Sequence, residues 1–128
     1  MQNKAKVSDM PDTLNKDCLF CRIVNKEIPA SFEYFNDEVV AFNDVNPQAP
    51  VHIIIIPKAH IEKVSDLELS HRNLIANLVL VANQLAKAKG IAETGYRIVI
   101  NCNKQAGQSV FHLHLHLLGG RPMNWPPG

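Results

Sequence analysis

The chain has 128 residues, of which 46% are apolar and 20% are charged, the ordinary composition of a globular protein with one domain. Its formal net charge is +1 and no block of like charge stands out, which argues against a general nucleic-acid or membrane surface. Three cysteines are too few, and odd in number, for a disulfide framework, so a soluble, cytoplasmic protein in a reducing environment is expected.

The first predicted element is a short helix that follows a polar arm. Residues 1–16 mix Lys, Asp, Asn and Pro without apolar periodicity, which predicts a flexible arm that carries no apolar core of signal-peptide length. In the stretch CLFCRIVNKEI the apolar residues recur at helical spacing, and we expect Asp17 to be the N-cap of a helix that ends before Pro29. Cys18 and Cys21 would share one face of this helix.

Three strands are predicted next along the chain. SFEYFND and EVVAFND read as a β-hairpin with a turn at Asn36-Asp37. After a loop that contains two prolines, the β-branched run VHIIIIP predicts a buried strand that stops at Pro57.

One long helix is predicted from Ser65 to Lys89. Ser65 and Glu68 suit a capping box, and Gly90 is the expected C-cap. Its apolar arc is wide, which predicts burial on more than one side and a homodimer formed through this helix, joined by the strand YRIVINC. A last strand over VFHLHLHLLGG and an irregular tail complete an α+β domain with a mostly antiparallel five-stranded sheet, one short helix and one long helix.

The most informative stretch is HLHLHLL, in which His112, His114 and His116 alternate with leucines. In a strand the three imidazoles project to one face and the leucines to the other, whereas a helix would turn His114 away from the other two. The residues leave three interpretations open: a half-polar strand, a row of metal ligands, and nucleophilic and acid–base chemistry on a phosphate. A third collinear imidazole diverges from the apex of a tetrahedral metal site, which weakens the second interpretation.

The same stretch matches the signature His-φ-His-φ-His-φ-φ, with φ apolar, of the histidine triad (HIT) family. Over residues 17–128 the segments KEIPA, NPQAPVH, IPKAH and GQSVFHLHLHLLGGRPMNWPPG resemble the Hint branch of that family, the purine nucleoside phosphoramidases. The resemblance implies a homodimeric HIT domain that hydrolyses the P–N bond of adenylylated amines or lysine, with no cofactor required for catalysis. The alternatives are hydrolysis of dinucleoside polyphosphates, nucleotidyl transfer, or an interaction protein that binds nucleotides and hydrolyses them incidentally.

The resemblance also implies roles for individual residues. His114 is the nucleophile that forms a nucleotidyl-histidine, His116 contacts the phosphate, and Ser109 hydrogen-bonds the scissile region and helps to protonate the leaving amine. His52 matches the fourth histidine of the family's site. The other expected contacts to the AMP moiety are Phe20, Ile23, Phe42 and Val45 at the base, Asp44 at the ribose, Asn101, Gly107 and Gln108 at the phosphate and ribose, and Trp125 in a tail (121–128) near the partner's active site. From sequence alone Asp44 suits a turn equally well, and the apolar residues are ordinary core types.

The Cys-x-x-Cys pair is a second candidate site. Cys18 and Cys21 can supply half of a zinc site, and the resemblance to zinc-binding members adds His60 of IPKAH and His112. With zinc bound, His112 would tether the catalytic strand to the first helix; without zinc it would help to orient the site. The alternative is that the two thiols pack as small hydrophobic groups.

Overall fold

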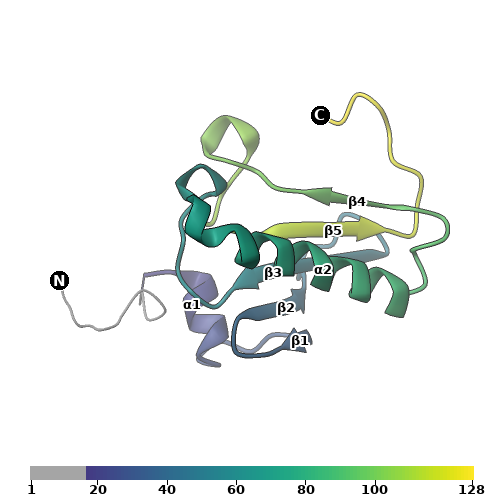
Figure 1. Ribbon diagram of the computed structural model, residues 1–128. Helices are drawn as coiled ribbons and strands as arrows, with labels where there is room; N and C mark the ends of the chain where they lie inside the picture. Colours follow the sequence, from purple (N-terminus) through teal and green to yellow (C-terminus); the bar gives the residue numbers. More distant parts are fainter. Residues whose placement is uncertain (1–16) are drawn as a thin grey trace.

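The protein, described here by a computed structural model over residues 17–128, is an α+β fold built on one five-stranded sheet (Figure 1). The strand order is β1-β2-β3-β5-β4, and every neighbouring pair is antiparallel. The elements are α1 (Leu19–Val24), β1 (Phe32–Phe35), β2 (Val39–Asn43), β3 (Val51–Pro57), α2 (Arg72–Ala88), β4 (Tyr96–Val99) and β5 (Leu115–Gly119). The predicted fold class is therefore confirmed, whereas the predicted arm over residues 1–16 lies outside the described residues.

The sheet separates two apolar clusters, and the alternation of β3 shows how. Ile53 and Ile55 pack with α2 on one face, while Ile54 and Ile56 pack with α1 on the other, as expected for a strand buried on both sides. Figure 1 shows α2 lying along one face of the sheet. Leu113, Leu115 and Leu117 belong to the α2 cluster, so the intervening histidines are directed to the α1 side.

The last strand begins later than predicted. β5 begins only at Leu115, and the chain over His112–His114 is irregular. The backbone N–H of Leu113 donates to the carbonyl of Ile61, which belongs to a loop and not to a strand. The side chains nevertheless keep their alternation, because Leu113 stays in the same cluster as Leu115 and Leu117.

The long helix is shorter than predicted. Two 3₁₀ turns, Val64–Asp66 and Leu69–His71, precede it, and α2 begins at Arg72. The physical reason lies at Glu68, whose extended backbone interrupts the helical path. Glu68 forms a capping box with His71, and this box replaces the predicted one between Ser65 and Glu68.

Two other predicted caps move by one residue. The N-cap of α1 is Cys18 and not Asp17, because the Cys18 Sγ accepts a hydrogen bond from the Cys21 backbone N–H at 3.3 Å. At the far end of α2 the C-cap is Lys89, and Gly90 follows it with a left-handed φ of 76°. Within residues 17–128 the protein has no helix with both the length and the apolar character needed to cross a membrane.

Candidate active site and metal-ligand cluster

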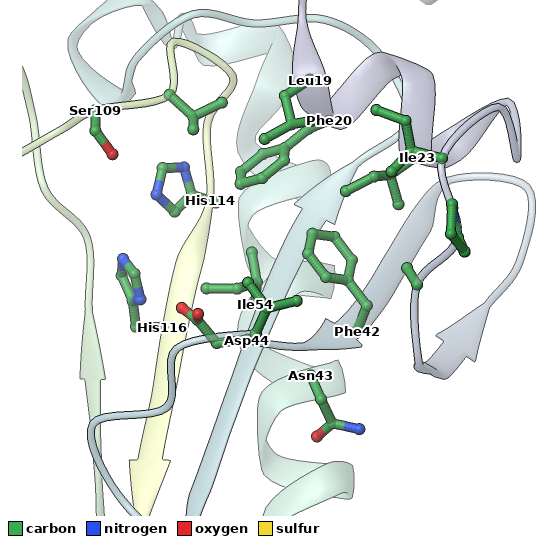
Figure 2. A pocket seen from close by; sticks show the side chains of 15 residues that line it. Leu19, Phe20, Ile23, Phe42, Asn43, Asp44, Ile54, Ser109, His114 and His116 are labelled. Atoms are coloured by element: carbon green, nitrogen blue, oxygen red, sulfur yellow. The ribbon is translucent and has the colours of Figure 1, made fainter.

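A pocket of about 360 Å³ opens on the α1 side of the sheet, with one apolar and one polar wall. Figure 2 shows Ser109, His114, His116 and Asp44 along one side and Phe20, Ile23 and Phe42 along the other. The lining residues are Leu19, Phe20, Ile23, Ile28, Pro29, Ala30, Phe42, Asn43, Asp44, Val45, Ile54, Ser109, Val110, His114 and His116. Eight of the predicted ligand contacts are among them, and the pocket's size suits a nucleoside.

Aromatic rings connect the two walls. Phe20 stands edge-to-face on Phe42, with ring centroids 5.4 Å apart, and edge-to-face on His114 at 5.1 Å. Sequence reasoning missed seven of the lining residues, which are Ile54, the group Ile28–Ala30, and Leu19, Asn43 and Val110. Ile54 reads as an ordinary buried strand residue, but the second group includes the Pro29-Ala30 end of KEIPA, whose match to the family's pattern was a usable signal.

The geometry around His114 fixes which of its nitrogens carries the proton. Its Nδ1 lies 2.7 Å from the backbone carbonyl of His112, and a carbonyl only accepts, so Nδ1 carries the hydrogen. The Nε2 atom is left with its lone pair. Burial lowers the pKa of His114, which keeps the ring neutral near neutral pH. His114 thus has the protonation state that a nitrogen nucleophile requires, and a backbone carbonyl holds its proton.

His52 is buried and contacts His116. The His52 Nε2 lies 2.9 Å from His116 Nδ1 and 3.4 Å from Asp44 Oδ2. These three residues place ligand atoms close enough for a metal. Two nitrogens on a tetrahedral zinc are about 3.3 Å apart, however. The shorter separation of 2.9 Å is that of two imidazoles sharing a proton in a hydrogen bond.

The pKa of His116 gives a prediction for stability. Burial, with the neighbouring His114 and His52, lowers the pKa of His116 from 6.5 to about 4. Between these values the unfolded chain binds a proton at His116 that the folded chain does not. The free energy of unfolding therefore has its full value above pH 6.5 and decreases as the pH falls toward 4. We expect the free energy of unfolding in urea to fall over that range, and less steeply in His116→Gln. Equal pH slopes in the two proteins would contradict the burial of a neutral His116.

Asp44 is placed for both roles that the sequence left open, a turn-forming residue and a pocket residue. Its Oδ1 accepts the Asn46 backbone N–H at 2.8 Å, which is a turn-forming contact, while its side chain also lines the pocket. Ser109 is exposed and lines the pocket, and in Figure 2 its side chain lies on the same side as His114.

The other predicted contacts do not line this pocket. The Gln108 side chain is buried and donates to the carbonyls of Glu62 and Val110, so it braces the loop that carries Ser109. Asn101 and Gly107 flank the same loop, and Trp125 is 81% exposed in the tail. The ligand contacts expected of Asn101, Gly107, Gln108 and Trp125 stay predictions.

Comparison with known proteins identifies the family of this chain. The family model described as "HIT domain" matches residues 25–123. The chain belongs to the HIT family. Purine nucleoside phosphoramidase of Escherichia coli (strain K12) is 44% identical over 108 residues, which cover 84% of this chain and 91% of that protein. The matched range of the family model includes the histidine triad and the pocket residues that follow α1.

Solved structures of HIT family hydrolases share the fold. The enzyme from Legionella pneumophila Philadelphia 1 superposes with a TM-score of 0.86 at 50% identity, covering 87% of this chain and 99% of that one. The enzyme from Clostridium thermocellum gives 0.84 at 45% identity, covering 86% and 96%.

The second cluster in this HIT fold lies beside the triad and joins Cys18, Cys21, His60 and His112. Their ligand atoms all lie within 4.8 Å of one another, and three of the four residues are buried. The Nδ1 atoms of His60 and His112 are 3.3 Å apart, and Cys18 Sγ lies 3.3 Å from His112 Nδ1. A tetrahedral zinc site requires about 3.3 Å between two nitrogens and about 3.6 Å between nitrogen and sulfur.

The orientation of His112 also suits a metal ligand. Its Nε2 lies 2.7 Å from the Pro57 carbonyl and therefore donates its hydrogen there, which leaves the Nδ1 lone pair directed at the thiols. Burial lowers the pKa of His112 to about 4, so the ring is neutral, as a ligand must be. The four residues consequently fit a metal of the zinc type.

Proposed function

We propose that this HIT-family protein hydrolyses the P–N bond of purine nucleoside phosphoramidates through a nucleotidyl-histidine on His114. One observation carries the proposal: the His112 carbonyl holds the His114 Nδ1–H, so a neutral ring with a nucleophilic Nε2 lines a pocket of nucleoside size. The relationship to the Escherichia coli phosphoramidase supports the choice of substrate class.

The reaction has two steps that share this nucleophile. In the first, His114 Nε2 attacks the α-phosphorus, the bond to the substrate's amine nitrogen breaks, and the leaving amine takes up a proton with help from the Ser109 hydroxyl. In the second, water attacks the same phosphorus and gives up a proton to solvent, which balances the proton taken up by the amine; the bond to His114 breaks, and the nucleoside monophosphate leaves. The His112 carbonyl stabilises the positive charge that the ring carries between the two steps.

The other pocket residues hold the nucleotide during both steps. Phe20, Ile23 and Phe42 provide apolar surface for the base, which grips a purine face but discriminates poorly between adenine and guanine. His116 donates a hydrogen bond to the phosphate, and Asp44 accepts from the ribose hydroxyls. Most of the interaction energy thus falls on the nucleoside monophosphate and not on the leaving group.

A substitution at Asp44 tests the ribose contact. Asp44→Asn keeps an oxygen for the Asn46 N–H but removes the charge that favours the ribose hydroxyls. We expect kcat/KM for an adenosine phosphoramidate to fall about 10- to 100-fold, the effect of losing one charged hydrogen bond. The 2′,3′-dideoxy substrate should react equally well with both proteins. A variant that loses activity equally on both substrates would place Asp44 outside ribose binding.

A comparison of substrates tests the reaction class. Purified protein is incubated with an adenosine phosphoramidate and, separately, with a dinucleoside polyphosphate, and the release of AMP is followed. The proposal predicts turnover of the phosphoramidate and slow or no turnover of the polyphosphate. The reverse preference would favour a polyphosphate hydrolase, and nucleotide binding without turnover would favour an interaction protein.

We further propose that Cys18, Cys21, His60 and His112 hold a structural zinc ion. When bound, zinc supplies a cross-link between α1 and the segment that carries His114, and catalysis does not depend on it. His112 acts toward the nucleophile only through its backbone carbonyl, which accepts the His114 Nδ1–H. Positioning the nucleophile is therefore the expected contribution of this ligand set.

We also propose the homodimer that the apolar arc of α2 predicts. Leu80 is 55% and Val79 is 37% exposed on α2, and β4 forms an edge of the sheet. Pairing of β4 and α2 with a second copy would cover these apolar groups and bring the tail (121–128) near the partner's pocket. Light scattering coupled to size exclusion measures the mass, and a monomer at micromolar concentration would count against the pairing.

A further inference from the structure

The loop between β2 and β3 connects the start of the C-terminal tail with the histidines of the pocket. Arg121 Nε donates a hydrogen bond of 3.0 Å to the carbonyl of Gln48. The backbone N–H of the same Gln48 donates a hydrogen bond of 3.0 Å to His52 Nδ1. A single residue of this loop therefore contacts both the tail arginine and the buried histidine.

The chain is built to bring Arg121 to this loop. After β5 the backbone turns at Gly120, which has a left-handed φ of 90°. A Cβ atom at Gly120 would lie 2.9 Å from the Cβ of Pro50, so the turn packs directly on the loop. Arg121 is itself exposed and does not line the pocket of its own protomer, so within one protomer its effect on the site passes through the groups that it holds.

The Gln48 N–H determines the tautomers of two histidines. Because that N–H can only donate, His52 Nδ1 is the acceptor and the proton of the neutral ring is on Nε2. The His52 Nε2–H faces His116 Nδ1 at 2.9 Å, nearer than the Asp44 Oδ2 at 3.4 Å. His116 Nδ1 is then an acceptor as well, and the proton of His116 is on Nε2, where it is available to a ligand in the pocket.

We propose that Arg121 is a positioning residue that, through the Gln48 peptide and His52, keeps His116 in the Nε2–H form. The proposal rests on the proposed function, because it supplies the hydrogen-bond donor that His116 offers to the phosphate. The proposal also couples the start of the tail, just after β5, to the tautomers of the histidines in the pocket. Without the Arg121 contact, the Gln48 carbonyl loses a charged partner and the Gln48 peptide is held less firmly against His52 Nδ1, so both tautomers of His52 and His116 become populated.

Arginine substitutions with two independent readouts test this proposal. Arg97 is the matched control, because it also binds the tail, through the Asn124 carbonyl at 3.0 Å, but has no contact with Gln48 among the hydrogen bonds of residues 17–128. Protein labelled with ¹⁵N in its histidines reports the tautomer of each ring by NMR. In Arg121→Ala we expect the nitrogen shifts of His52 and His116 to move from single-tautomer values toward averaged ones, whereas Arg97→Ala keeps the original values.

The kinetic readout separates positioning from simple loosening of the tail. The phosphate carries more negative charge in the transition state than in the bound substrate, so the His116 donor contributes more to kcat than to KM, and Arg121→Ala should lower kcat about tenfold with a smaller change in KM. Imidazole nitrogen shifts in Arg121→Ala identical to those of the original protein would overturn the proposal, as would equal changes in Arg97→Ala. The NMR measurement needs no substrate, so it decides on Arg121 even if the protein proves inactive on phosphoramidates.

Discussion

Replacing His114 with alanine is expected to lower the rate of phosphoramidate hydrolysis by about four orders of magnitude or more, the size of effect seen when a covalent nucleophile is removed. The reason is that alanine offers no atom to attack the phosphorus, while the rest of the pocket stays in place. Binding should survive, because the apolar wall, Asp44 and His116 remain. Steady-state release of AMP and equilibrium binding of AMP, measured on the same preparations, check both expectations.

A matched histidine outside the pocket provides the control for this experiment. His71 belongs to the 3₁₀ turn before α2, where its ring accepts the Glu68 backbone N–H at 2.9 Å, and it does not line the pocket. His71→Ala should keep the kcat of the original protein. If His114→Ala retained a tenth of that activity, the nucleophile would have to be sought elsewhere in the pocket.

The second large effect concerns the metal-ligand cluster. Cys18→Ser is expected to abolish zinc retention and to lower the midpoint of thermal unfolding by about 10 °C, which corresponds to roughly 3 kcal/mol for a domain of this size. The cause is twofold: a metal that binds only the folded chain stabilises it, and the remaining buried ligands lose their common partner. Metal analysis and calorimetry on protein purified without chelator measure both quantities.

Cys102 is the matched control for that substitution. It is partly exposed, its Sγ lies 3.4 Å from the Ser65 hydroxyl, and it is not one of the four residues of the metal-ligand group. Cys102→Ser should keep its zinc and its unfolding temperature. Less than a tenth of an equivalent of zinc in the original protein would contradict the structural zinc, and the four residues would then form a buried hydrogen-bonded cluster.

The alternation of residue types carried most of the fold prediction. Period-two patterning in HLHLHLL correctly placed the leucines on one face and the histidines on the other, because a strand directs alternate residues to opposite faces, and the β-branched content of VHIIIIP correctly indicated a buried strand. The boundaries were less accurate for a local reason. The Glu68–His71 capping box and the Leu113–Ile61 hydrogen bond each end a regular element by a contact that periodicity does not encode.

The candidate site, like the fold, was predictable from sequence only in part. The signature led to His114 and His116, and the spacing of Cys18 and Cys21 led to half of the metal-ligand cluster, because both are short-range patterns. Phe42 and Ile54 could not be told apart as pocket or core residues, since an apolar wall and an apolar core use the same side chains.

The connection from Arg121 through Gln48 to His52 was not predictable from sequence. It depends on a backbone N–H and a backbone carbonyl, which every residue other than proline possesses. Only the folded position of the loop decides which side chains these two groups meet.

The most direct test of the account is the mass of the protein during turnover. A phosphoramidate is mixed with the enzyme, the reaction is stopped with denaturant within the first turnover, and the intact mass is measured, followed by peptide mapping. We predict a species heavier by one nucleoside monophosphate less water, with the nucleotidyl group on His114, and no such species in His114→Ala. Full release of AMP with no adduct, or an adduct on a different residue, would contradict the central claim.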